Sequence, residues 1–492
     1  MKYTLEIVAF FSGMVVMILE LTGSRIVAPY LGTSVIIWTS LIGVILASLA
    51  VGYWLGGKYA DKNPDIQVLQ RILLLAGVFI ILIALMQPLL IFISSGGKSL
   101  EISAIIAMIV LFSPATVALG MVSPYVIRLK LTNISDSGST VGAMYAISTL
   151  GSIFGTFLGG FVLISLFGSI KILFIIAAII LILATLVSWQ KRLTVLICIL
   201  FILLASILFF HFSPKVLLAN NVDSVFDIDT TYSRIWGYEK GYGPENRQGR
   251  FITSVYKGIQ SGIYLDDTDE LMFEYAKGYD LMEYYNPTLQ NVLMVGGGAY
   301  TYPRYFSGRY PQASMDIVEI DEGMLDLARE YFSYTNYSNV HEFFEDGRRY
   351  LNSNKKIYDA VLIDAFSNTL AIPFHLTTVE ASREIRESLS DNGVAIINVV
   401  GSLVGEKSLF VSGYYHTLRS VFPEVSIYKM TNAPEIEIQS LIFVANKLPG
   451  DENILNERQE LRDILAKKWT SNIPISDYLL TDDYAPVERL LY

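Results

Sequence analysis

The hydrophobic pattern divides the chain near residue 212. Before that point the sequence consists mainly of apolar runs, and about twenty residues suffice to cross a bilayer as a helix. The first run has no small-residue cleavage site and leads directly into another, so we expect it to be retained rather than removed as a signal peptide. The pattern predicts a transmembrane domain over 1–212 with seven helices, near 4–29, 34–57, 71–94, 102–128, 139–167, 170–188 and 193–211.

Beyond residue 212 the pattern changes to short β-type runs. Two of them, around 233–238 and 251–256, flank a turn rich in Gly, Pro and Asn and predict a small β-sheet region over 213–290. From 291 onward, buried-strand runs alternate with amphipathic helices, which is typical of a doubly wound, mostly parallel sheet. We therefore expect a Rossmann-like, methyltransferase-type α/β domain over 291–450, followed by a C-terminal helix and tail over 451–492. Its predicted strands are 291–295, 315–320, 340–344, 358–363, 393–399, 425–428 and 440–444.

Charge separates the two halves as clearly as hydropathy does. The first 212 residues contain eleven Lys/Arg and six Asp/Glu, a balance of about +5, so the whole-chain charge of −10 leaves about −15 on the remainder. An acidic soluble half is a poor partner for nucleic acid and a suitable one for a cationic small molecule. The single cysteine, Cys198, excludes an intrachain disulfide.

The distribution of Lys and Arg between the predicted spans favours a cytoplasmic N-terminus. With seven spans the soluble half would then emerge outside the cell membrane. A soluble half that uses a small metabolite would instead be expected in the cytoplasm, where such molecules are supplied. The sequence leaves both alternatives open.

Two features of the predicted spans carry structural information. Glu20 and Arg25 lie in the first span, where a charge is costly and usually faces a partner or a cavity, unless it reaches the interface. In the fifth span the glycines repeat along one helix face and predict close helix packing: Gly151, Gly155, Gly159 and Gly160.

Three consecutive strand ends of the predicted α/β domain carry residues suited to a nucleoside. Bare backbone N–H groups at 296–298 precede a helix, as in phosphate- and nucleotide-binding turns. The second strand ends with Glu319 and Asp321, where carboxylates can accept hydrogen bonds from both ribose hydroxyls. The third ends with Asp346 and Gly347, where an acid can reach an adenine amino group. Because these ends meet at one sheet edge, they predict a single adenosine-binding crevice, with ordinary helix caps as the alternative.

The fourth strand ends at Asp364. We expect its side chain to face the reacting carbon of an adenosine-linked sulfonium donor bound in this crevice. A carboxylate there can deprotonate an attacking amine, and an amine must lose its proton to displace a sulfonium substituent. A cap on the following segment is the alternative role. This displacement requires no metal.

Together these motifs resemble the spermidine synthase (polyamine aminopropyltransferase) family, in its membrane-fused branch, over roughly 220–490. The segments 373–378 and 480–488 also resemble motifs of that branch. The resemblance implies a catalytic role for Asp364. It implies donor contacts, to decarboxylated S-adenosylmethionine or S-adenosylmethionine as co-substrate, from Gln260, Gly296, Gly297, Gly298, Glu319, Asp321, Asp346 and Gly347.

Departures from the family pattern concern the substrate side. Ala299 stands where soluble members carry an acid that holds the amine of the decarboxylated donor, and Ser367 replaces a polyamine-binding acid. Tyr275 begins a Tyr-Ala-Lys stretch in place of Tyr-His-Glu. We take Tyr275, Ser367, His375 and Asp483 as substrate-binding candidates. A structural histidine and a solvated C-terminal turn are the alternatives for the last two.

The sequence thus predicts a membrane-anchored, spermidine synthase-like transferase that alkylates a small-molecule amine, by aminopropyl transfer in polyamine biosynthesis. A first alternative is an S-adenosylmethionine-dependent methyltransferase acting on a lipid or membrane-delivered substrate. A second is a transporter or sensor whose nucleotide domain is regulatory. Besides the amine, the lipid bilayer is the expected partner, and a homodimer stays open.

Overall fold

The computed structural model describes residues 3–94, 96, 99–131, 133, 136–187, 200, 223–256, 258–365, 372–448, 458–474, 476 and 479–491. Two compact units are present. The first comprises Met1–Trp236 with Ser254–Tyr256, and the second Gly237–Thr253 with Lys257–Tyr492. The boundary therefore runs through strand β2 (Arg234–Tyr242).

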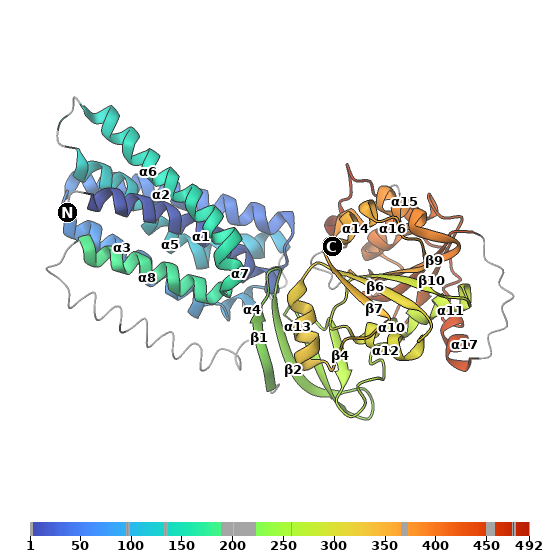
Figure 1. The fold of residues 1–492 in the computed structure, drawn as a ribbon. Coiled ribbons are helices and arrows are strands. Elements are labelled where there is room, and N and C mark those ends of the chain that lie inside the picture. The colour runs from blue at the N-terminus through green and yellow to red at the C-terminus, as the bar shows by residue number, and fades with distance from the viewer. Residues whose placement is uncertain are drawn as a thin grey trace. The chain divides into compact units, whose positions relative to one another are not determined.

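Long apolar helices make up the first unit (Figure 1). Within the described residues, six helical spans are long and apolar enough to cross a membrane, counting Ser137–Leu166 as one. The predicted span 102–128 is a single helix although it contains Pro114 and Pro124. The predicted span 193–211 lies outside the described residues. The helices are α1 (Thr4–Leu31), α2 (Val35–Lys62), α3 (Ile66–Leu85), α4 (Leu89–Ser94), α5 (Leu100–Lys130), α6 (Ser137–Phe157), a π-helical segment (Leu158–Leu163), α7 (Ile164–Leu166) and α8 (Ser169–Val187).

Glycines bring helix backbones into direct contact in this bundle. A Cβ atom added to Gly151 of α6 would lie 1.9 Å from the Phe10 carbonyl oxygen of α1, and one on Gly155 would lie 2.4 Å from that of Met14. At Gly159, in the π-helical segment, the nearest atom would be 3.4 Å away. Without side chains at the first two positions, α1 and α6 pack more closely than any larger residue would permit. This agrees with the predicted glycine face.

Polar contacts surround the end of the first span. The Arg25 guanidinium donates to the carbonyl oxygens of Thr230 and Thr231, both at 2.8 Å, in the turn after β1 (Asp223–Asp229). Nearby in sequence, Arg234 forms a two-armed ion pair with Asp227 at 2.8 and 2.7 Å. The cation predicted to need a partner in the first span therefore has one in backbone carbonyls.

The second unit is built on a seven-stranded sheet of order β10-β11-β9-β8-β5-β6-β7. Strands β7, β6, β5, β8 and β9 are parallel, and β11 and β10 join antiparallel. A four-stranded sheet of order β1-β2-β3-β4 precedes it in the chain. The remaining strands are β3 (Arg247–Thr253), β4 (Ser261–Tyr264), β5 (Asn291–Val295), β6 (Ser314–Glu319), β7 (Val340–Phe344), β8 (Tyr358–Ile363), β9 (Leu389–Gly401), β10 (Glu424–Lys429) and β11 (Gln439–Asn446).

Helices cover both faces of this sheet, with α10 to α13 on one side and α14 to α16 on the other (Figure 1). Their apolar faces pack on strands that are buried on both sides, which explains the continuous apolar runs of β5 and β8. The predicted fold class is confirmed. The helices are α10 (Glu274–Lys277), α11 (Leu281–Tyr285), α12 (Thr301–Arg309), α13 (Glu322–Tyr331), α14 (Gly347–Ser353), α15 (Val379–Ser388), α16 (Leu409–Arg419), α17 (Gln459–Leu465) and α18 (Val487–Leu491).

Candidate functional site

The glycine turn after β5 takes a backbone shape that side chains disfavour. Gly296 and Gly298 have φ angles of +95° and +52°. A Cβ atom on Gly296 would lie 2.5 Å from the carbonyl oxygen of Asp364, at the end of the neighbouring strand β8. Only glycine therefore allows this turn to pass directly beside Asp364.

Glu319, the last residue of β6, is held against that turn. One carboxylate oxygen accepts from the Gly297 N–H at 2.8 Å and the other from the Asp321 N–H at 3.0 Å. The side chain is largely buried, and burial raises its pKa despite these hydrogen bonds. A carboxylate offers about four acceptor positions, so Glu319 keeps the capacity to accept a further hydrogen bond from a ligand. This arrangement fits the predicted ribose contact.

The other two acids predicted to bind the donor, Asp321 and Asp346, lie at helix N-termini. Asp321 accepts from the Gly323 N–H at 3.1 Å and begins α13, while Asp346 accepts from the Arg349 N–H at 3.0 Å and begins α14. Capping, the alternative role considered from the sequence, is therefore present for both. The cap occupies one oxygen of each carboxylate. The predicted nucleoside contacts are therefore compatible with the structure.

Asp364 follows β8 directly and is paired with the next strand. The Asn398 side-chain amide of β9 donates to its carboxylate at 2.9 Å. Burial raises the pKa of Asp364 to about 6, helped by the charge of Glu319 and opposed by hydrogen bonding from Asn398 and the nearby Tyr279 hydroxyl. The carboxylate is thus a base that is ionised at neutral pH and able to take up a proton.

Two buried polar atoms in this part of the domain have no hydrogen-bond partner among the described residues, the Oε1 atom of Gln260 and the Oδ1 atom of Asn398. The Tyr279 hydroxyl lies near the Asp364 carboxylate. Tyr275 joins this group, because its hydroxyl lies 3.5 Å from the Gln260 carbonyl oxygen and its ring contacts Tyr279 edge-on. An unsatisfied buried polar group costs about 1–3 kcal/mol, so these atoms are suited to hydrogen-bonding a ligand.

Sequence reasoning singled out neither Tyr279 nor Asn398. A polar Asn within the otherwise apolar run Gly393–Val399 was the available signal. Tyr279 carried none, because it is one of several tyrosines between β4 and β5.

The substrate-binding candidates do not all come together. Tyr275 lies beside Asp364, since that carboxylate influences the raised pKa of its phenol. His375 instead lies against Asp346, with 3.2 Å between its Nε2 atom and the carboxylate. Asp483 is exposed in the turn between Thr481 and Tyr484. Ser367 lies outside the described residues.

Comparison with known proteins agrees with this architecture. Residues 280–451 match the family described as "Spermine/spermidine synthase domain". A polyamine aminopropyltransferase of Vibrio vulnificus is 27% identical over 256 residues, covering 49% of this chain and 83% of that protein. The eEF1A lysine and N-terminal methyltransferase of Homo sapiens is 26% identical over 208 residues, covering 39% of this chain and 28% of that protein.

Among solved structures, a probable spermidine synthase from Corynebacterium glutamicum aligns with a TM-score of 0.40 and 21% identity, covering 51% of this chain and 87% of that chain. Residues 280–451 thus match a spermine/spermidine synthase domain, and they follow an N-terminal region whose described residues include six long apolar helices.

Proposed function

We propose that the protein is a membrane-anchored transferase that uses an S-adenosyl donor to alkylate an amine, by aminopropyl transfer from decarboxylated S-adenosylmethionine. The observation that carries this proposal is Asp364, a buried carboxylate with a raised pKa that lies beside the glycine turn and next to Asn398, whose amide oxygen has no hydrogen-bond partner among the described residues. The domain match and the polyamine aminopropyltransferase relative support the same reaction class.

In the proposed reaction the amine nitrogen attacks the carbon of the aminopropyl group that is bonded to sulfur. A C–N bond forms as the C–S bond breaks, and the electron pair of that bond leaves with sulfur as the neutral thioether methylthioadenosine. The proton lost by the amine goes to Asp364. The chain's own contribution is to hold the nucleoside through Glu319 and the glycine turn and to orient the amine beside Asp364.

Methyl transfer from intact S-adenosylmethionine is the second candidate, and one observation favours it. Ala299 occupies the position where an acid would bind the amine of the decarboxylated donor, and it is buried without charge. The similarity to a methyltransferase points the same way. Both reactions need the same nucleoside crevice and base, so the donor distinguishes them.

The test supplies the purified full-length protein, in lipid nanodiscs, with one donor at a time and a panel of amines that includes putrescine. Mass spectrometry of the nucleoside product decides the reaction. We expect methylthioadenosine from the decarboxylated donor. Formation of S-adenosylhomocysteine alone would replace aminopropyl transfer with methyl transfer, and no amine-dependent product from either donor would refute both.

The rate should depend on pH through Asp364. Only the ionised carboxylate can accept the proton, so kcat/KM should fall about tenfold per pH unit below a pH of about 6. Replacing Asn398 with Leu removes a hydrogen bond that favours the charged form of Asp364. The fall of kcat/KM on the acid side should therefore begin at a higher pH. If kcat/KM of this variant fell at the same pH as in the wild type, the assignment to Asp364 would be contradicted.

A further inference from the structure

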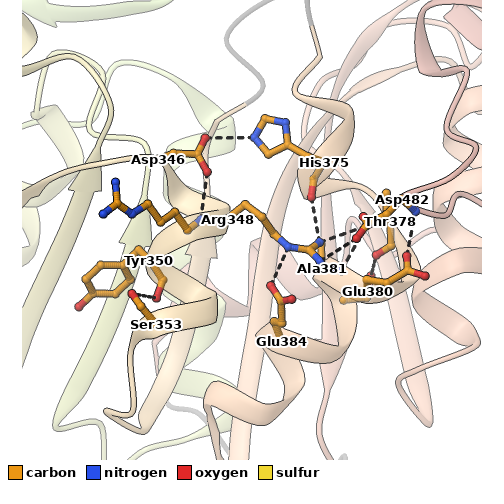
Figure 2. A network of polar contacts seen from close by, with 12 residues as sticks. Asp346, Arg348, Tyr350, Ser353, His375, Thr378, Glu380, Ala381, Glu384 and Asp482 are labelled. Atoms are coloured by element: carbon orange, nitrogen blue, oxygen red, sulfur yellow. Dashed lines mark hydrogen bonds and ion pairs between the residues drawn. The ribbon is translucent and has the colours of Figure 1, made fainter.

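Arg348, in the first turn of α14, joins three segments that are distant in sequence (Figure 2). Its guanidinium donates to the His375 carbonyl oxygen at 3.0 Å and to Asp482 at 3.0 Å, and forms an ion pair with Glu384 at 2.8 Å. Only 13% of the side chain is exposed. Such an arginine, with a planar fork between two carboxylates, fixes the position of the groups it contacts.

Asp482 is itself held in place on the other side of Arg348. Its second oxygen accepts from the Thr378 hydroxyl at 2.7 Å, and its backbone N–H donates to Glu380 at 3.0 Å. The turn that carries it is closed by two backbone hydrogen bonds between Thr481 and Tyr484, both 3.0 Å long. The C-terminal turn is therefore fastened to the start of α15 and, through Arg348, to the start of α14.

The network extends to the candidate adenine-binding acid through His375. Arg348 holds the His375 backbone, and the His375 ring lies 3.2 Å from the Asp346 carboxylate. A carboxylate only accepts, so the ring N–H donates to it. Because 37% of each of these two side chains is exposed, neither is fixed by burial alone. Asp346 is also held by capping α14, whereas the position of the His375 ring beside it depends on the Arg348 anchor.

We infer that Asp482, acting through Arg348 and His375, is a positioning residue that orients Asp346 toward the purine 6-amino group of the donor. This inference rests on the proposed function, because it assumes a nucleoside bound at Asp346. It adds a role for the C-terminal turn, which contributes to donor selection without contacting the donor.

Isothermal titration of the full-length protein in nanodiscs tests the inference with two probes. These are 5′-methylthioadenosine and its analogue that lacks the 6-amino group. We expect the wild type to bind the amino compound more tightly, and Asp482→Ala to reduce that preference about three- to tenfold, as expected for losing a partly exposed charge-assisted contact. A general loss of stability would weaken the binding of both probes alike. The ratio of the two affinities therefore separates an effect on positioning from an effect on folding.

Matched variants define the outcome. Asp326→Ala removes the same side chain from an exposed position of α13 and should leave the ratio unchanged. Asp482→Asn keeps one oxygen for Arg348 and should recover most of the preference. Arg348→Lys keeps the positive charge but loses the planar guanidinium, and should reduce the affinity ratio. It replaces Asp482→Ala as the test if that variant does not fold. An unchanged ratio in Asp482→Ala and Arg348→Lys overturns the inference alone, whereas a wild type that binds neither probe overturns the proposed function.

Discussion

Asp364→Asn is expected to lower kcat by about two to four orders of magnitude, the usual contribution of a positioned general base. The amide has nearly the same shape and can still contact Asn398, but it cannot accept the amine proton. Binding of methylthioadenosine should stay within about threefold of the wild type, because the nucleoside contacts come from other strand ends. Steady-state rates and titration on the same preparation measure both quantities.

Stability provides the control for this variant. The pKa of Asp364 is raised in the folded protein, so its protonated form is favoured there, and this stabilisation is lost as the pH rises through about 6. At pH 7.5 the neutral Asn should therefore unfold at the same temperature as the wild type or higher. Unchanged turnover in a stable Asp364→Asn protein would contradict the assignment of Asp364 as the general base.

Glu319→Gln is expected to weaken nucleoside binding by about 10- to 100-fold, the equivalent of roughly 1.4–2.8 kcal/mol. Both carboxylate oxygens accept backbone N–H groups, so an amide must turn its NH₂ toward one of these donors. The substitution therefore disturbs the glycine turn and also removes an acceptor for the ribose. Titration with methylthioadenosine measures the loss.

Glu322→Gln is the matched control, because Glu322 is exposed three residues further on, in the first turn of α13. We expect its affinity to equal that of the wild type. Equal affinities for Glu319→Gln and Glu322→Gln would remove Glu319 from the donor site, even if other evidence kept the nucleoside in the crevice.

Much of the candidate donor site could be predicted because parallel strands bring their ends to one edge. Gly296, Glu319 and Asp364 are far apart in sequence, yet each directly follows or ends a strand whose apolar run is recognisable. Once the strands are known, their order in a doubly wound sheet brings these residues together. The Glu319 carboxylate also contacts the turn through the Gly297 backbone N–H, which every residue except proline would provide.

The surroundings of that site could not be predicted in the same way. Tyr279 and Asn398 reach Asp364 from a helical segment and from a neighbouring strand, and His375 lies against Asp346 rather than beside the base. Such contacts depend on where side chains meet after packing. The hydrophobic periodicity of the sequence does not predict which side chains meet in this way.

The amino-acid sequence alone thus determined the parts of this protein that follow from the length of its apolar runs and the spacing of its apolar residues. These are the apolar spans, the glycine face of α6, the strand runs and the residues at their ends, because each depends on neighbours in sequence. Only the tertiary structure decided that burial raises the pKa of Asp364 to about 6 and that Arg348 joins α14 to the C-terminal turn. Burial and long-range ion pairs arise from residues as many as 134 positions apart, as Arg348 and Asp482 are, and are therefore properties of the folded chain.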